Sequence, residues 1–145
     1  MLKQNSSIMK ALNVTLMFDG NTETVFNFYK SVFGGEFASL QRFKDIPNGP
    51  PLPEDQKDKI LYMGLPLAGV LLSGMDIPPQ MPSPVTGTNF TIALDMDSEE
   101  EVTRIYNGLA QNGQTRFPPG PQFWTTFFAM VTDQYGITWM LSYRK

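Results

Sequence analysis

The chain has 145 residues, enough for one domain that buries roughly two-thirds of the surface its unfolded chain would expose. Its 11 basic and 14 acidic side chains include no clustered basic stretch of the kind that binds nucleic acid. No stretch approaches the roughly 20 apolar residues of a membrane span. Cysteine and histidine are absent, which excludes disulfides, thiolate nucleophiles and the commonest metal ligand. We expect a cytoplasmic protein with no nucleic-acid or membrane partner.

The first predicted elements are a strand and an amphipathic helix. Residues 1–9 are expected to form a frayed lead-in, and residues 11–18 are rich in β-forming side chains. Asn21 is the expected N-cap of a helix whose apolar residues recur at i, i+3, i+4 and i+7. These residues are Val25, Phe28, Tyr29 and Val32. The pair Gly34-Gly35 supplies the positive-φ exit that ends such a helix.

Three strands and two proline-rich loops complete the first half. The strands are expected at 36–43, 60–65 and 69–73. The segment 44–59 contains four prolines, which exclude a central strand or a helix interior. It is therefore expected to be a long loop of the kind that borders a binding site. Residues 76–87 form a second proline-rich loop.

The same order of elements then repeats. A strand at 89–95 precedes a helix that Ser98 is expected to cap. The apolar stripe of that helix consists of Val102, Ile105, Tyr106 and Leu109, and Asn112-Gly113 ends it. Strands are expected at 114–117, 123–131 and 137–143, with prolines 118, 119 and 121 breaking the chain after the first and a turn at 133–136 before the last.

The duplication predicts an α+β fold made of two βαβββ modules. The modules span about 10–75 and 88–145, joined by the loop 76–87 within a single domain, 10–145. Several strands are apolar at both alternating positions, which indicates burial on both faces. We therefore expect a curved mixed sheet around a cavity, with the helices on the outer face.

Three stretches, NFYKSVFGGEF, RFKDIP and FFAMVTDQYGITWML, carry a family resemblance. They resemble the vicinal-oxygen-chelate superfamily of glyoxalase, bleomycin-resistance and dioxygenase proteins, and within it the PhnB-like branch, over residues 9–143. The resemblance implies the duplicated fold and a homodimer. Branch members are often labelled demethylubiquinone methyltransferases, but this chain has no glycine-rich strand-to-helix turn that would hold S-adenosylmethionine.

Metal-dependent relatives bind a divalent ion through His, Gln or Glu side chains on the first, fourth, fifth and last strands. The resemblance places three of these positions at or beside Val14, near Phe90 and at Met140, which cannot ligate a hard cation. We therefore expect no metal and no other cofactor. The predicted lining is apolar and soft, and it includes Leu16, Phe18, Ile92, Thr138 and Trp139.

The residues predicted to contact a ligand are Trp124, Tyr62, Arg42, Met140, Val14 and Phe90. Trp124, at a strand entrance, either stacks on a ligand ring or fills a dimer interface. Arg42 either binds an anionic ligand or forms a surface ion pair, with Asp45 as a nearby partner. Asp76 and Asp95 are the best-placed carboxylates for proton transfer, although an Asp at a strand end more often caps a turn. The sequence identifies no catalytic residue.

The leading hypothesis is a protein that binds a small apolar or aromatic molecule in a metal-free cavity, whether or not it catalyses a reaction. One alternative is a metal-dependent lyase or dioxygenase of the glyoxalase type. Another is a structural or partner-binding dimer whose cavity is filled by its own Met and Phe side chains. A homodimer is expected in each case, because apolar strand faces and edges would otherwise be exposed.

Overall fold

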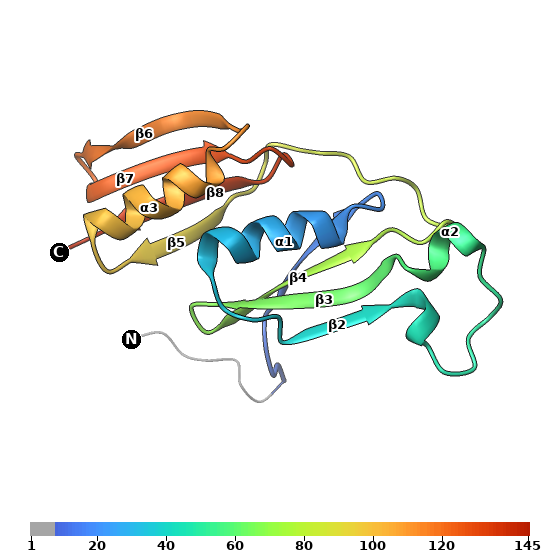
Figure 1. Cartoon of the computed structure of the whole chain (residues 1–145). Coiled ribbons are helices and arrows are strands. Elements are labelled where there is room, and N and C mark those ends of the chain that lie inside the picture. The colour runs from blue at the N-terminus through green and yellow to red at the C-terminus, as the bar shows by residue number, and fades with distance from the viewer. Residues whose placement is uncertain (1–7) are drawn as a thin grey trace. The chain divides into compact units, whose positions relative to one another are not determined.

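The computed structural model describes residues 8–145, so most of the predicted lead-in at 1–9 lies outside the described residues. The fold is α+β and contains two modules of the order β-α-β-β-β, as predicted (Figure 1). Each module forms its own four-stranded mixed sheet, so two sheets replace the single curved sheet that the sequence predicted. Among residues 8–145, every helix is too short or too polar to cross a membrane.

The first module contains five main elements and two short helical turns. They are β1 Val14–Phe18, α1 Thr22–Phe33, β2 Ser39–Arg42, η1 Phe43–Asp45, α2 Glu54–Lys57, β3 Ile60–Leu67 and β4 Val70–Asp76. The second module contains β5 Ile92–Met96, α3 Glu99–Leu109, β6 Gln114–Gln122, β7 Thr125–Thr132 and β8 Thr138–Tyr143.

The described chain divides into two compact units. Unit 1 contains residues 8–26 and 35–84, and unit 2 contains residues 27–34 and 85–145. The division falls inside α1 and inside the proline-rich loop that was expected to join the modules.

In unit 1 the strand order is β1-β4-β3-β2, with β1 and β4 parallel and the other pairs antiparallel. Leu16, Gly74 and Met63 lie in one row across β1, β4 and β3. A methyl group on Gly74 would overlap the ring of Phe26, so this row faces α1. Because side chains alternate along a strand, Thr15, Ser73 and Tyr62 belong to the opposite face.

The start of α1 is held by a carboxylate from the end of β4. Asp76 is 2% exposed, and its Oδ1 accepts hydrogen bonds from the Thr22 amide (3.0 Å) and the Thr22 hydroxyl (2.7 Å). Its Oδ2 accepts the Ile60 amide at 2.8 Å, which also fixes the start of β3. The carbonyl of Asn21 accepts the Val25 amide at 3.1 Å, so the helix begins where the sequence predicted. Asp76 is therefore a cap, the alternative to a proton-transfer role.

In unit 2 the strand order is β5-β8-β7-β6, with β5 and β8 parallel. Val131, Trp139 and Leu141 are fully buried on the face that carries α3, which lies along the sheet in Figure 1. The buried residues of α3 are Val102, Ile105 and Leu109, three members of the predicted stripe. The Ser98 hydroxyl accepts the Glu101 amide at 3.2 Å, which confirms the predicted N-cap.

The core of unit 2 is organised by the buried carboxylate of Asp133. Its Oδ1 accepts the backbone amides of Tyr135 (2.8 Å) and Ile137 (3.2 Å), which closes the turn before β8. Its Oδ2 accepts the Tyr29 hydroxyl (2.7 Å) and the Trp139 indole N–H (2.9 Å). Two of the stretches that carry the family resemblance, NFYKSVFGGEF and FFAMVTDQYGITWML, therefore meet at one side chain.

The buried Tyr29 hydroxyl makes the protein less stable at alkaline pH. Burial, reinforced by the neighbouring Asp133 charge, raises the pKa of Tyr29 far above its ordinary value near 10. The unfolded chain ionises at that ordinary value, so the stabilising contribution of Tyr29 is intact below pH 10 and is lost as the pH rises further. Between pH 9 and pH 11 we expect the free energy of unfolding to fall by about 1.4 kcal/mol more than in Tyr29→Phe, measured by urea denaturation. Equal losses would show that Tyr29 ionises as freely in the fold as in the unfolded chain.

Three local predictions were wrong for identifiable reasons. Prolines 118, 119 and 121 lie inside β6 and do not end it, because β6 is an edge strand with an irregular register that tolerates missing amide donors. Residue 66, also a proline, continues β3, since β2 pairs with β3 only as far as Gly64. The β3–β4 turn lies at Ala68-Gly69, both with positive φ. The segment 44–59 holds part of η1 and the single turn of α2.

Candidate functional site

The face of the unit 2 sheet opposite α3 carries a strip of apolar and thioether side chains. Strand register places Phe117, Met130, Met140 and Ala93 in one row across β6, β7, β8 and β5. The adjacent row contains Gly120, Phe128, Ser142 and Asp95. We call these two rows, with Trp124, the open face of unit 2.

Three aromatic rings form a cluster at one end of the open face of unit 2. Phe128 is buried, and its ring lies edge-on to Phe117 at 5.7 Å and to Trp124 at 5.4 Å. The outer two rings are only partly covered, since Phe117 is 41% and Trp124 45% exposed. Phe123 packs on Trp124 at 4.8 Å between centroids. The cluster therefore presents half-exposed rings whose inner edges are held in place by Phe128.

Polar groups border this strip. The Thr91 hydroxyl donates to the Met140 sulfur at 3.2 Å, which orients that thioether. Asp95 is exposed on edge strand β5 and places a carboxylate beside Ser142. The arrangement offers flat rings, polarisable sulfur and one peripheral hydrogen-bond acceptor. Such a surface suits binding of a ring through dispersion and stacking.

Three of the predicted ligand contacts lie in unit 2. Met140 and Trp124 both belong to the open face of unit 2, on the same side of one sheet. Phe90 precedes β5 and is 50% exposed. Of the residues predicted to line the cavity, Thr138 lies on the same face of the sheet as Met140. Ile92 and Trp139 lie on the opposite face. Trp139 packs on Tyr29 and Phe33 in the core of unit 2.

The other three predicted contacts lie in unit 1, on different faces of its sheet. Tyr62 is half-buried on the face opposite α1, where its hydroxyl shares a 2.8 Å hydrogen bond with Ser73. Val14 is 36% exposed and has the alternation of Leu16 and Phe18, which are buried on the side of α1. Leu16 and Phe18 therefore belong to the core of unit 1. Because side chains alternate along a strand, Val14 and Tyr62 lie on opposite faces of the sheet of unit 1.

Arg42 forms an ion pair, but with a different partner from the one considered. Its guanidinium donates to both carboxylate oxygens of Glu23, at 2.9 and 2.7 Å, and to the Asp58 carbonyl at 2.8 Å. Asp45 accepts the backbone amide of Arg42. The hydrogen bond from Arg42 lowers the pKa of Glu23, with a weaker opposing effect of burial. In this geometry Arg42 joins β2 to α1.

The aromatic and thioether members of the open face of unit 2 that were absent from the predicted site are Phe117, Phe128 and Met130. The alternation of Phe128, Met130 and Thr132 along one strand was visible in the sequence. Phe117 could be placed opposite Met130 only if the strand was continued through the prolines that follow it. A strand that ended at Phe117 would lack the pairing of Gly120 with Phe128, which continues the open face of unit 2.

The residues present do not fit the divalent ion of the metal-dependent relatives. Val14, Phe90 and Met140, the positions assigned by resemblance, carry two hydrocarbon side chains and one thioether, whereas a hard cation requires oxygen or imidazole ligands. Within residues 8–145, acidic side chains do not gather in the groups of three or more that could hold a metal ion.

Comparison with known proteins supports the resemblance. The family model of the Glyoxalase/Bleomycin resistance protein/Dioxygenase superfamily matches residues 11–141. Protein YjdN of Escherichia coli (strain K12) is 28% identical over 142 residues, covering 92% of this chain and 95% of that protein. The crystal structure of protein PA1353 from Pseudomonas aeruginosa superposes with a TM-score of 0.81 at 32% identity, covering 94% of this chain and 98% of that one. The PhnB protein from Bacillus cereus gives a TM-score of 0.71 at 25% identity, covering 92% and 99%. The chain belongs to the Glyoxalase/Bleomycin resistance protein/Dioxygenase superfamily.

Proposed function

We propose that this protein binds a small apolar or aromatic molecule on the open face of unit 2, without a metal ion. The observation that carries the proposal is the pair of half-exposed rings, Phe117 and Trp124, beside the thioethers of Met130 and Met140. Exposed aromatic rings that are held in one orientation lose little conformational freedom when a ligand stacks on them.

The energetics favour a flat ring over an aliphatic chain. Burial of roughly 100 Å² of apolar surface contributes about 2.5 kcal/mol, and an aromatic pair adds about 0.5–1.5 kcal/mol. Methionine side chains adapt their shape and make favourable contacts with ring edges, so Met130 and Met140 suit an aromatic guest. Indole, a flat aromatic ring system, is therefore a suitable probe.

Removal of the outer ring tests the proposal. In Trp124→Ala we expect indole to bind about tenfold more weakly than to the wild type, because loss of stacking and apolar contact removes about 1.4 kcal/mol. The measurement is isothermal titration calorimetry on both proteins. Val85→Ala, at an exposed apolar residue of the same unit, is the matched control and should leave the affinity unchanged. Unaltered binding to Trp124→Ala would contradict the proposed site.

The exposed rings also favour a second candidate, a contact between two copies of the chain. Phe123 is 96% exposed next to Trp124, and apolar rings of this kind often mark a protein interface. A homodimer formed through this surface would lose stability on Phe123→Ala. Sedimentation equilibrium at micromolar concentration measures the dimer directly, and a clean monomer would contradict this candidate.

A further inference from the structure

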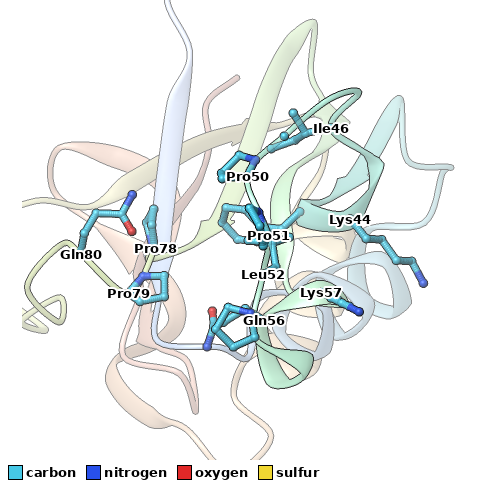
Figure 2. A pocket seen from close by; sticks show the side chains of 13 residues that line it. Lys44, Ile46, Pro50, Pro51, Leu52, Gln56, Lys57, Pro78, Pro79 and Gln80 are labelled. Carbon is cyan, nitrogen blue, oxygen red and sulfur yellow. The ribbon is translucent and has the colours of Figure 1, made fainter.

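A pocket lies in unit 1, remote in sequence from the open face of unit 2. It has a volume of about 620 Å³ and is built from the loop after β2, α2 and the residues that follow β4. Figure 2 shows Pro78 and Pro79 on one side and Pro50, Pro51 and Leu52 on the other. We call it the proline pocket. Its volume lies within the range of about 300–1,000 Å³ typical of small-molecule sites.

The apolar walls of the proline pocket are built mainly from side chains with little internal freedom. Each proline has a fixed φ and a closed ring, so the wall is formed before a ligand arrives and little entropy is lost on binding. The flat faces of these rings offer C–H groups to a guest, and the aromatic ring of Phe43 adds to the lining. An aromatic guest matches such walls, because the negative face of a ring attracts the positively polarised C–H groups.

The charge of the lining is one-sided. Lys44 and Lys57 are the charged side chains among the described residues that line the pocket, and both are cationic in a chain with a net charge of −3. Lys44 pairs with Asp58 at 2.7 Å and Lys57 with Glu54 at 2.6 Å, and the lysine side chains remain 51% and 42% exposed. Ion pairs as exposed as these are weak, and each ammonium has three donors. Both lysines can therefore bind an additional anion.

Two glutamines add neutral donors to the same lining. Gln56 on α2 is half-buried, and Gln80 follows the second proline pair. Figure 2 shows both side chains beside the Pro78-Pro79 wall. A side-chain amide can donate two hydrogen bonds, which a carboxylate accepts. The pocket thus combines an apolar, ring-sized interior with cationic and amide donors.

We infer that the proline pocket binds a small aromatic carboxylate. This site is additional to the proposed function, because its lining belongs to unit 1 and shares no residue with the open face of unit 2. The ring lies between the proline walls, and the carboxylate accepts hydrogen bonds from the amides. Lys44 and Lys57 supply positive charge at the Pro51-Leu52 side of the pocket (Figure 2).

The test compares 2-naphthoate with its neutral analogue 2-naphthamide by isothermal titration calorimetry. We expect the wild type to bind 2-naphthoate about tenfold more tightly, since each exposed lysine contributes about threefold. The double variant Lys44→Gln/Lys57→Gln should lose this preference. Lys10→Gln/Lys145→Gln, which makes the same change in net charge at residues outside the pocket, should retain it. The salt dependence of the naphthoate affinity should disappear in the first variant and persist in the second.

A single substitution separates the pocket from long-range charge. Gln56→Glu introduces a carboxylate of nearly the same shape, and like-charge repulsion should weaken 2-naphthoate binding by about tenfold while 2-naphthamide is unaffected. In a ¹H–¹⁵N spectrum, 2-naphthoate should shift the amides of Leu52, Gln56 and Gln80. Equal affinities for the two probes, no binding of 2-naphthoate at millimolar concentration, or equal effects of the two double variants would overturn the inference. None of these results bears on indole binding at Trp124.

Discussion

Replacement of Asp133 by alanine is expected to lower the free energy of unfolding by about 3–5 kcal/mol. The substitution deprives the Tyr29 hydroxyl and the Trp139 indole N–H of their acceptor in the core of unit 2. It also removes the acceptor for the amides of Tyr135 and Ile137, which close the turn before β8. Each buried donor left without an acceptor costs about 1–3 kcal/mol, and entry of water recovers part of that sum.

Two further variants give this prediction its controls. Asp133→Asn retains Oδ1 for the turn but directs an NH₂ group at the Trp139 indole donor, so an intermediate loss of about 1–2 kcal/mol is expected. Asp97→Ala, at an exposed acid of the same unit, should change stability by no more than about 0.5 kcal/mol. The measurement is urea denaturation followed by circular dichroism. An Asp133→Ala protein as stable as Asp97→Ala would show that the carboxylate does not organise this core.

The second large effect is expected at Asp76 in unit 1. Asp76→Ala should lower the free energy of unfolding by about 3 kcal/mol, because it leaves the Thr22 amide, the Thr22 hydroxyl and the Ile60 amide without an acceptor. It also removes a negative charge from the N-terminus of the 12-residue helix α1, where the helix dipole favours an anion. The first turn of α1 and the start of β3 should then lose their connection.

Hydrogen exchange distinguishes a local from a general effect of Asp76→Ala. The amides at the start of α1 and β3 should lose more protection than those of unit 2, because the broken hydrogen bonds lie within unit 1. Asp55→Ala, an exposed acid on α2, is the matched control and should leave stability within about 0.5 kcal/mol of the wild type. Uniform loss of protection, or no loss at all, would argue against the capping role.

The elements that the sequence predicted best are those with strong local signals. The apolar stripe of α3, the Ser98 cap and the exit at Gly34-Gly35 each depend on a few neighbouring residues, and the structure contains all three. The duplicated order of elements was visible for the same reason. The division into two separate sheets was not, because it depends on which distant strands pair.

The errors arose where tertiary context overrides a local rule. Proline is excluded from central strands but tolerated in edge strands, and β6 is an edge strand. The sequence alone did not show that β6 lies at the edge of its sheet. The face on which Val14 lies depends on strand parity relative to α1, and a count from family positions did not resolve it. Single-residue differences in register therefore decided which predicted site residues share a face.

The candidate site was predicted in part. Trp124 and Met140 were identified from the strand entrance and the family position, and the structure places both on the open face of unit 2. Their neighbours Phe117 and Phe128 follow only from the pairing of β6 with β7. The sequence predicted that the proline-rich loop 44–59 borders a binding site, but it did not show that residues of the second proline-rich loop, 76–87, line the same pocket.

The most direct test of the proposed function is a titration with indole followed through the methionine methyl groups. In protein labelled with ¹³C at the methionine methyls, ring currents from bound indole should shift the signals of Met130 and Met140, which lie beside the Phe117 and Phe128 rings. Met17 and Met75, in unit 1, serve as internal references and should not move. Saturable shifts confined to Met130 and Met140 are the predicted result; a titration in which indole leaves both signals in place, or shifts only the unit 1 methyls, would contradict the proposal.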